Sequence, residues 1–181
     1  MSLQRHPESA GPTSQLAVQV SRPAPGILAV SYVLAIDPEQ LCLPPLAAPV
    51  RADALWRRTC FEAFISPGGG DGYFEFNVSP SGQWAAYAFK AYRLGMRNAE
   101  VPEPPRIESE TGAEAFKLTA RVSLAARPRL ADARFWRLGL SAILEHPSGG
   151  KSYWALAHPA GKPDFHHPDS FTLELSAPEP A

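Results

Sequence analysis

The sequence has little cysteine, no excess of charge of either sign and no long apolar run. Its 181 residues include two cysteines, and 17 Lys and Arg against 18 Asp and Glu give a net charge of −1. Two cysteines cannot build a disulfide framework, and Cys42 and Cys60 lack the short spacing of a metal site. A charge near zero supplies no basic surface, so we expect no nucleic-acid partner.

The longest apolar run, Gly26–Ile36, is too short to span a bilayer. No apolar stretch follows Met1, so the chain as given shows no secretory signal. We therefore expect no membrane partner and, by default, a cytoplasmic location.

Proline is abundant instead, at 20 residues, roughly twice its ordinary share. Because proline breaks helix interiors, it divides the chain into short segments. These segments alternate apolar and polar residues with the period of a strand or are rich in β-branched and aromatic residues. The predicted strands are Gln15–Ser21, Gly26–Ile36, Thr59–Ser66, Tyr73–Ser79, Gln83–Tyr92, Phe116–Leu124, Trp136–Leu144, Ser152–His158 and Phe171–Leu175. The continuous apolar run of the second predicts a strand buried on both faces.

Turn signals separate these segments. Pro67–Gly72, Ser79–Gly82 and Ser148–Gly150 are predicted hairpin loops, and only Pro38–Leu41 and Leu130–Phe135 favour short helices. The prediction is an all-β antiparallel sandwich of about nine strands, with a jelly-roll or an immunoglobulin-like order both open. One domain should span residues 15–176, and the tails 1–14 and 177–181 should be loose.

The first candidate site lies around Trp56 and Glu62. On a strand Thr59–Ile65, Cys60, Glu62 and Phe64 share one face. A carboxylate buried on such an apolar strand is costly unless a cation or a hydrogen-bond donor contacts it. Glu62 is therefore either half of a structural ion pair or the floor of a ligand cleft. Trp56, in the approach to the strand, is either a core plug or lid, or a ligand platform.

Two further groups are weaker candidates. Glu75 and Asn77 lie on the face opposite Phe76, where they either line a cleft or, as we favour, form the wet face of a sheet. His158, Asp164, His166 and His167 could supply metal ligands. Their spacing matches no strong motif, so we expect them to tie a long loop to the sandwich. Calcium remains possible through Asp and backbone oxygens.

No nucleophile elbow, phosphate loop or dinucleotide fingerprint is present. Catalysis would need a general acid and a general base in one pocket, and only Glu62, Glu75 and the histidines could provide them. We therefore expect a protein that is not an enzyme.

Three motifs carry a resemblance to a known family. They are Trp56-x-x-x-Cys60-x-Glu62-x-Phe64, Tyr73-x-Glu-x-Asn77-x-x-Pro-x-Gly82, and Ser152-Tyr-Trp154 with Pro163-Asp-Phe-His166. Together they resemble the DOMON-like β-sandwich domains, and within these the relatives of family 9 carbohydrate-binding modules. The resemblance runs from about residue 15 to residue 175.

This resemblance implies a ligand cleft in which two tryptophans hold a terminal sugar and charged or amide groups bind its hydroxyls. Trp56 and Glu62 fit the family's Trp and Glu, and Trp154 would be the second platform. Lys151 stands where the family has an amide, and Arg93 and Gln83 are both candidates for its arginine. Some DOMON domains hold haem through Met and His. Since Met96 has no obvious His partner in the sequence, haem is unlikely.

The leading hypothesis is a non-catalytic domain that binds a small saccharide without a cofactor. An interaction or scaffold domain with a self-filled cleft is the alternative from another class, and a haem- or metal-binding redox domain ranks third. The sequence does not indicate an oligomeric state.

Overall fold

The proline-divided segments become antiparallel strands in the computed structural model, which describes residues 1–12, 14–68 and 70–178. The described residues form twelve strands: β1 (Ser2–Arg5), β2 (Gln15–Ala24), β3 (Ile27–Ala35), β4 (Cys60–Ser66), β5 (Tyr73–Val78), β6 (Trp84–Phe89), β7 (Arg97–Asn98), β8 (Arg106–Thr111), β9 (Ala115–Ser123), β10 (Phe135–Glu145), β11 (Lys151–Ala155) and β12 (Leu173–Ser176). Four short helices join them: η1 (Pro38–Gln40), η2 (Leu55–Arg57), α1 (Pro128–Ala131) and η3 (Pro168–Ser170).

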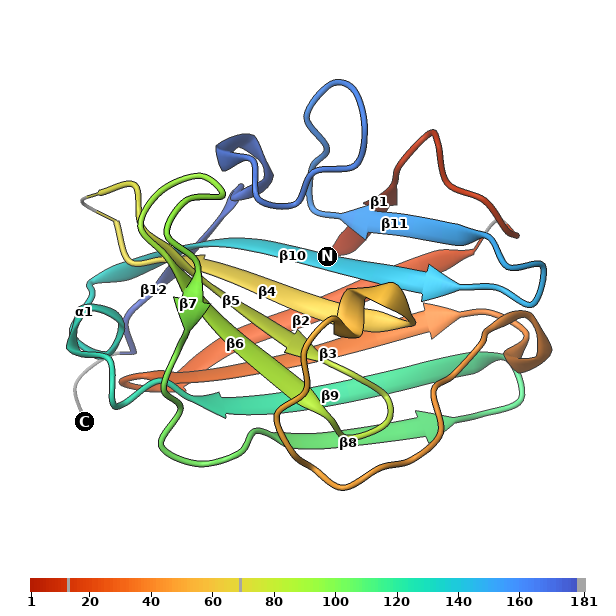
Figure 1. The fold of residues 1–181 in the computed structure, drawn as a ribbon, viewed down its shortest axis with the longest axis horizontal. Coiled ribbons are helices and arrows are strands. Elements are labelled where there is room, and N and C mark those ends of the chain that lie inside the picture. The colour runs from red at the N-terminus through yellow and green to blue at the C-terminus, as the bar shows by residue number, and fades with distance from the viewer. Residues whose placement is uncertain (13, 69, 179–181) are drawn as a thin grey trace.

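The strands follow one hydrogen-bonded path that curls into two layers (Figure 1). Its order is β7-β6-β5-β4-β10-β11-β1-β2-β3-β9-β8, and β12 pairs with β10 beside this path. We call β2, β3, β9 and β8 sheet A, and β7, β6, β5, β4, β10, β11 and β12 sheet B. Strand β1 pairs with β11 at Gln4↔Ala155 and with β2 at Leu3↔Leu16, so it joins the two sheets. The predicted β-sandwich is confirmed.

Sheet A has one buried and one open face. Along β9, Phe116, Leu118 and Ala120 are buried, whereas Lys117 and Arg121 are exposed. The neighbouring β3 alternates in the same way, with Val33 exposed on the open face. The prediction that β3 is buried on both faces is therefore wrong: its small and β-branched outward residues meet solvent, because no element covers them.

The central strands of sheet B are buried on both faces. Every residue of β6 is buried, and so is every residue of β4 except Ser66. One face carries Phe61, Ala63 and Ile65 into the core between the sheets. The other carries Cys60 and Phe64 into a second apolar cluster that includes Leu55, Phe165 and Phe171. Those three residues lie in η2 and in the connection 156–172, which together we call the loop cover; that connection forms the loops at the top of Figure 1.

The main core lies between the two sheets, where Tyr32, Phe61, Phe116 and Trp136 are fully buried. One of its polar groups links the two sheets. Tyr32 Oη donates a hydrogen bond to the carbonyl of Glu62 at 2.8 Å and so connects β3 to β4 across the core. Because a satisfied buried hydroxyl fixes its neighbour, this bond holds the strand that carries Glu62.

All nine predicted strands are present, with ends that differ by a few residues. The sequence did not predict β1, β7 or β8. Residues 1–14 are not a wholly loose tail, because Ser2–Arg5 pairs on both sides as β1. The connection Gly95–Ser109 contains β7 and most of β8. The tips of the predicted loop Pro67–Gly72 and of the tail 177–181, at residues 69 and 179–181, lie outside the described residues.

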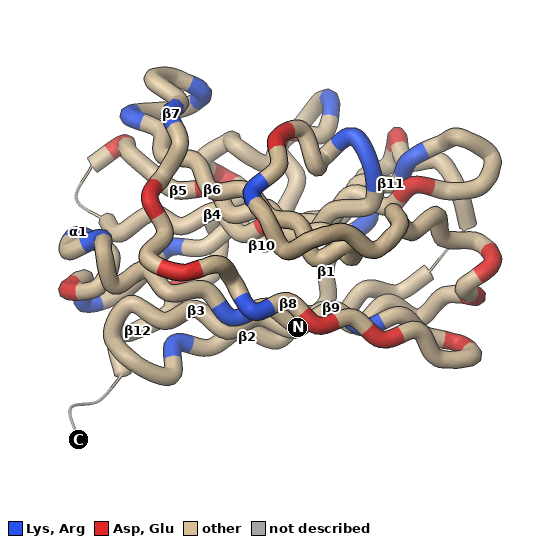
Figure 2. Tube along the Cα trace, turned by 60° about the horizontal axis from the view of Figure 1, so that its bottom comes forward, with Lys and Arg blue, Asp and Glu red and all other residues tan. Residues whose placement is uncertain are grey.

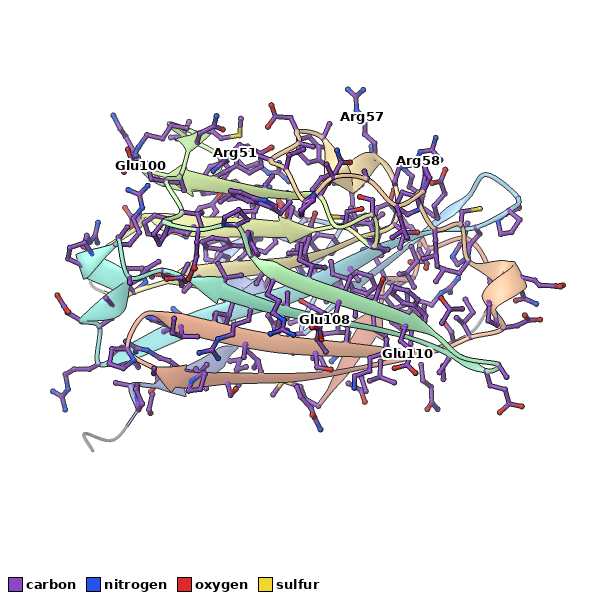
Figure 3. All side chains as sticks on the ribbon, turned by 90° about the horizontal axis from the view of Figure 1, so that it is seen from below. Arg51, Arg57, Arg58, Glu100, Glu108 and Glu110 are labelled. Atoms are coloured by element: carbon purple, nitrogen blue, oxygen red, sulfur yellow. The ribbon has the colours of Figure 1, made fainter. Side chains whose placement is uncertain are left out.

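Charged residues of both signs are spread over both layers (Figure 2). The edge strand β8 is polar, and Figure 3 shows Glu108 and Glu110 along it. Charges on an edge strand oppose pairing with another chain, and they leave β8 without the apolar alternation that reveals a strand in a sequence. In the described part of the chain, no helix has the length and apolar character needed to cross a membrane.

Candidate functional site

A cavity of about 570 Å³ opens between the outer face of sheet B and the loop cover. Its walls combine aromatic rings with four ionisable groups. The lining residues are Trp56, Glu62, Glu75, Tyr87, Phe89, Arg93, Met96, Ile143, Tyr153, Pro163, Phe165 and His166. Sheet strands supply the acids and the floor, whereas loops supply Trp56, Arg93, Met96 and His166.

Trp56 is placed over this face by the short helix η2. The preceding Ala54 takes a left-handed conformation, φ 60°, which turns the chain sharply into the helix. Leu55 is buried in the second apolar cluster and anchors the turn. Trp56 itself stays 40% exposed and meets Tyr87 edge-on, with ring centroids 6.4 Å apart. It therefore offers an indole surface to the cavity instead of plugging the core.

Two carboxyl groups lie beneath the rings. Glu62 and Glu75 come from the adjacent strands β4 and β5 and are diagonal neighbours in the register, since Glu62 pairs with Asn77 and Phe64 with Glu75. Ser141 Oγ donates to Glu62 Oε2 at 3.0 Å, and Asn77 Nδ2 donates to Glu75 Oε1 at 2.8 Å. These donors supply one hydrogen bond to each carboxyl group.

The environment keeps both carboxyl groups protonated to an unusually high pH. Burial and, to a smaller extent, the nearby Glu75 raise the pKa of Glu62 to about 8, against the hydrogen bond from Ser141. Burial also raises the pKa of Glu75 to about 7, against the hydrogen bond from Asn77 and the charge of Arg93. The site thus contains two acids that can hold or release protons near neutral pH.

A cluster from the loop cover closes one side of the cavity. Tyr73 Oη and Nδ1 of His166 are 2.8 Å apart, and Nε2 of His166 lies 3.8 Å from Oε2 of Glu75. Burial lowers the pKa of His166 to about 4, so the ring is neutral at pH 7. Arg93 forms an ion pair with Asp164, Nη2 to Oδ1 at 2.8 Å, which ties the β6–β7 connection to the loop cover.

The structure brings some of the predicted site residues together and separates others. Trp56, Glu62 and Arg93 all line the cavity. Trp154 does not face Trp56: it is 3% exposed in the core between the sheets, and its Nε1 donates to Ser152 Oγ. The expected pair of facing indoles is therefore wrong, because Trp154 pairs with Ala142 and so shares its inward face.

Lys151 and Gln83 are not among the residues that line this cavity. Lys151 Nζ donates to the carbonyl of Arg57 at 2.6 Å, and so braces η2 from the outside. Gln83 lies in the β5–β6 turn, where its Oε1 is 3.5 Å from Ser81 Oγ.

The sequence missed several lining residues. Glu75 and Asn77 are 5% and 0% exposed, so they do not form a wet face. Tyr153, next to the predicted Trp154, is the aromatic residue that faces the cavity. Strict alternation along Ser152–Ala155 separates these two side chains. The β10–β11 register, in which Ala142 pairs with Trp154 and Ile143 with Tyr153, shows which of the two aromatic residues points inward. The sequence alone does not give this register.

Metal ligands do not gather in the described residues: nowhere in ranges 1–12, 14–68 and 70–178 do three or more His, Cys, Asp or Glu side chains form a group that could hold an ion. His158 interacts with the carbonyl of Gln4 through Nε2, at 2.8 Å. His167 Nδ1 accepts a hydrogen bond from the amide of Asp169 and so caps η3 within the loop cover.

Met96 and His166 share the cavity, which the sequence did not show. They are the residue types that hold haem in some DOMON domains. A histidine ligand needs a ring nitrogen free to face the metal. In this structure Nδ1 of His166 is engaged by Tyr73, and Nε2 faces the carboxylate of Glu75. The arrangement therefore does not fit haem ligation by His166.

Solved structures share this fold. A "putative carbohydrate-binding protein" from Bacteroides uniformis ATCC 8492 is 14% identical, with a TM-score of 0.62 over 97% of this chain and 87% of its own. A family 9 carbohydrate-binding module from Caldicellulosiruptor kristjanssonii in complex with cellotriose is 10% identical, with a TM-score of 0.59 over 96% and 80%. The same kind of module in complex with glucose is 11% identical, with a TM-score of 0.59 over 96% and 81%.

At these identities the likeness shows the fold alone. No protein-family model matches the sequence, and no curated protein matches it. The fold is thus that of family 9 carbohydrate-binding modules, whereas the DOMON-like part of the resemblance stays a prediction.

Proposed function

We propose that this protein binds a small saccharide, without a catalytic step, in the cavity between sheet B and the loop cover. The observation that carries the proposal is the pairing of a 40% exposed indole, Trp56, with a buried carboxyl group, Glu62, in one open cavity. The fold supports it, because modules of this fold are seen with cellotriose and glucose.

The lining chemistry suits a sugar ring. A pyranose packs its C–H face against an aromatic ring, and Trp56, Tyr153 and Phe165 supply such rings from different sides. Its hydroxyl groups need polar partners, and the polar side chains of Glu62 and Arg93 line the cavity. Charged groups make stronger hydrogen bonds to hydroxyls than neutral groups do. With few ligand atoms to contact, the affinity should be modest.

Calorimetric titration with glucose, cellotriose and a panel of other mono- and oligosaccharides tests this proposal. At least one sugar should bind, and Trp56→Ala should weaken its affinity by about fivefold or more, since stacking on one ring contributes on the order of 1 kcal/mol or more. Leu46→Ala, at an 85% exposed position outside the cavity lining, is the matched control and should change nothing. Absence of binding to every saccharide would end the proposal.

Glycoside hydrolysis is a second candidate, because Glu62 and Glu75 line the same cavity with pKa values raised to about 8 and 7. A hydrolase needs a carboxyl acid and a carboxylate base beside the scissile bond. Release of nitrophenol from aryl glycosides by the natural protein, lost in Glu62→Gln and Glu75→Gln, would favour hydrolysis. No release alongside measurable sugar binding would favour the binding role.

A scaffold domain with a self-filled cleft is disfavoured by the open cavity and by the exposed Trp56. It would be the better description if no sugar bound and Trp56→Ala had no effect on any ligand.

A further inference from the structure

Each carboxyl group on the cavity floor has an oxygen with no hydrogen-bond donor. Glu62 is 4% exposed; Ser141 satisfies its Oε2, and among the described residues its Oε1 has no hydrogen-bond partner. Glu75 is 5% exposed; Asn77 satisfies its Oε1, and the nearest cationic atom to its Oε2, Nε2 of His166, is 3.8 Å away, too far for a hydrogen bond. Both of these almost buried acids line the cavity, and each keeps one oxygen without a hydrogen-bond donor among the described residues.

The cations around these acids are engaged or neutral. Arg93 lines the cavity, but its guanidinium pairs with Asp164 and lies over the ring of Tyr92. His166 is neutral, since burial lowers its pKa. Tyr87 Oη donates to Asp53, a further acid behind the wall. The polar floor is therefore short of positive charge.

The two carboxyl groups compensate by holding protons. Burial raises the pKa of both Glu62 and Glu75, because an isolated buried carboxylate is costly. A neutral hydroxyl group from a sugar leaves this cost largely in place. A bound cation would remove it, because it stabilises both carboxylates and displaces their protons.

The aromatic side chains that line the cavity also favour a positively charged ligand. Trp56, Tyr87, Phe89, Tyr153 and Phe165 surround the floor. The faces of such rings attract cations, most strongly where water is excluded. Aromatic walls above an acidic floor complement an ammonium group, whereas they oppose a carboxylate or phosphate.

We propose that the natural ligand is an amino sugar, whose free ammonium group binds between Glu62 and Glu75 while its ring packs against Trp56. This inference rests on the proposed saccharide binding and narrows it to sugars that carry a free amine. Binding releases protons from the two carboxyl groups to solvent, and the ammonium group keeps its own.

Calorimetric titration at pH 6.5 with D-glucosamine, D-glucose and N-acetyl-D-glucosamine tests the proposal. D-glucosamine should bind about tenfold or more tightly than the two neutral sugars, since charge-assisted hydrogen bonds are roughly twice as strong as neutral ones. Repeating the titration in two buffers of different ionisation enthalpy should reveal proton release with D-glucosamine and none with D-glucose.

Charge-removing variants locate the effect. Glu62→Gln and Glu75→Gln should each reduce the preference for D-glucosamine over D-glucose by several-fold, and both should abolish part of the proton release. Both variants keep the side-chain shape and remove a costly buried charge, so they should fold. Glu110→Gln, on the exposed edge strand β8, is the matched control and should keep the full preference (Figure 3).

The outcomes separate the two proposals. If neutral sugars bind as tightly as D-glucosamine, the amino-sugar inference is overturned and saccharide binding stands. If D-glucosamine is preferred but Glu62→Gln and Glu75→Gln leave the preference intact, the assignment to these carboxyl groups is overturned. If no sugar binds, both proposals fail together.

Discussion

The two sheets differ in what their outer faces meet. The outer face of sheet A meets solvent, and its strands alternate buried and exposed residues. The outer face of sheet B lies under the loop cover, and its strands β4 and β6 are buried almost throughout. A site for a small ligand needs both concavity and shelter from water. The covered face of sheet B provides both, and there the chain places Glu62, Glu75 and Trp56.

The inner and outer sides of sheet B also separate two tryptophans with different roles. Trp154 points inward from sheet B and supports the core, whereas Trp56 lies in the loop cover and borders the cavity. Side chains of the same type, both beside sheet B, thus serve stability and recognition separately. Mutations can divide the two roles.

The largest expected effect comes from the inward side. Trp154→Ala should lower the free energy of unfolding by about 3–5 kcal/mol, because it leaves a large cavity in the core. Denaturant unfolding measures this loss. Sugar affinity of the folded fraction, titrated well below the unfolding transition, should change less than about twofold. Loss of binding by a fully folded Trp154→Ala protein would show that the inner and outer faces are not separate.

The second effect is a pH dependence of stability from the covered acids. Because the folded-state pKa values of Glu62 and Glu75 are raised to about 8 and 7, the folded protein binds more protons than the unfolded one below these values. Stability should therefore fall from pH 6.5 to pH 8.5, by an amount on the order of 2 kcal/mol. Urea unfolding at several pH values provides the measurement.

Below pH 6.5, His166 changes stability in the opposite sense. Its pKa is lowered to about 4, so protonation of the buried ring is unfavourable and stability decreases as the pH falls from 6.5 toward 4. Glu62→Gln should remove most of the fall between pH 6.5 and 8.5, and Glu110→Gln should not. A natural protein whose stability is flat over this range would contradict the buried, cation-poor environment of the two acids.

A smaller effect tests the loop cover itself. Arg93→Met removes the ion pair with Asp164, the neighbour of Phe165 and His166. The Arg93 side chain is 51% exposed, so the loss of stability should stay within about 1 kcal/mol. Sugar affinity should fall by a few-fold, because the loop cover loses one of its ties. Unchanged affinity in titration would mean that sheet B alone sets the geometry.

The smallest effect is expected on the open face of sheet A. Val33→Thr keeps a β-branched residue at an exposed position of β3. Stability should change by about 0.5 kcal/mol or less, and sugar affinity should not change. A substantial loss of binding in this variant would indicate a second ligand surface and would break the contrast between the sheets.

The sequence predicted much of the fold because most strands alternate or carry aromatic and β-branched residues. It missed β8, whose outward Glu108 and Glu110 leave no apolar period, and β1, which is only four residues long. Such strands are stabilised by hydrogen bonds to neighbouring strands. The pattern of apolar and polar residues within the strand does not reveal those neighbours.

Prediction of the site was limited by the same physics. The alternation along β4 correctly put Glu62 on the face opposite Phe61, but in a sheet buried on both sides alternation does not tell which face meets the core. That ambiguity misassigned Trp154 and hid Tyr153. The position of His166 depends on contacts with Tyr73, 93 residues earlier in the chain, which no local signal reveals.

Strand β1 has a consequence for how the molecule is made. Its residues are synthesised before those of β11, yet Arg5 pairs with Trp154. The two sheets can therefore join through β1 only after β11 has left the ribosome, and until then the unpaired edge of β1 is available for wrong partners. Nascent chains arrested short of residue 154 should consequently be caught by chaperones and remain sensitive to protease.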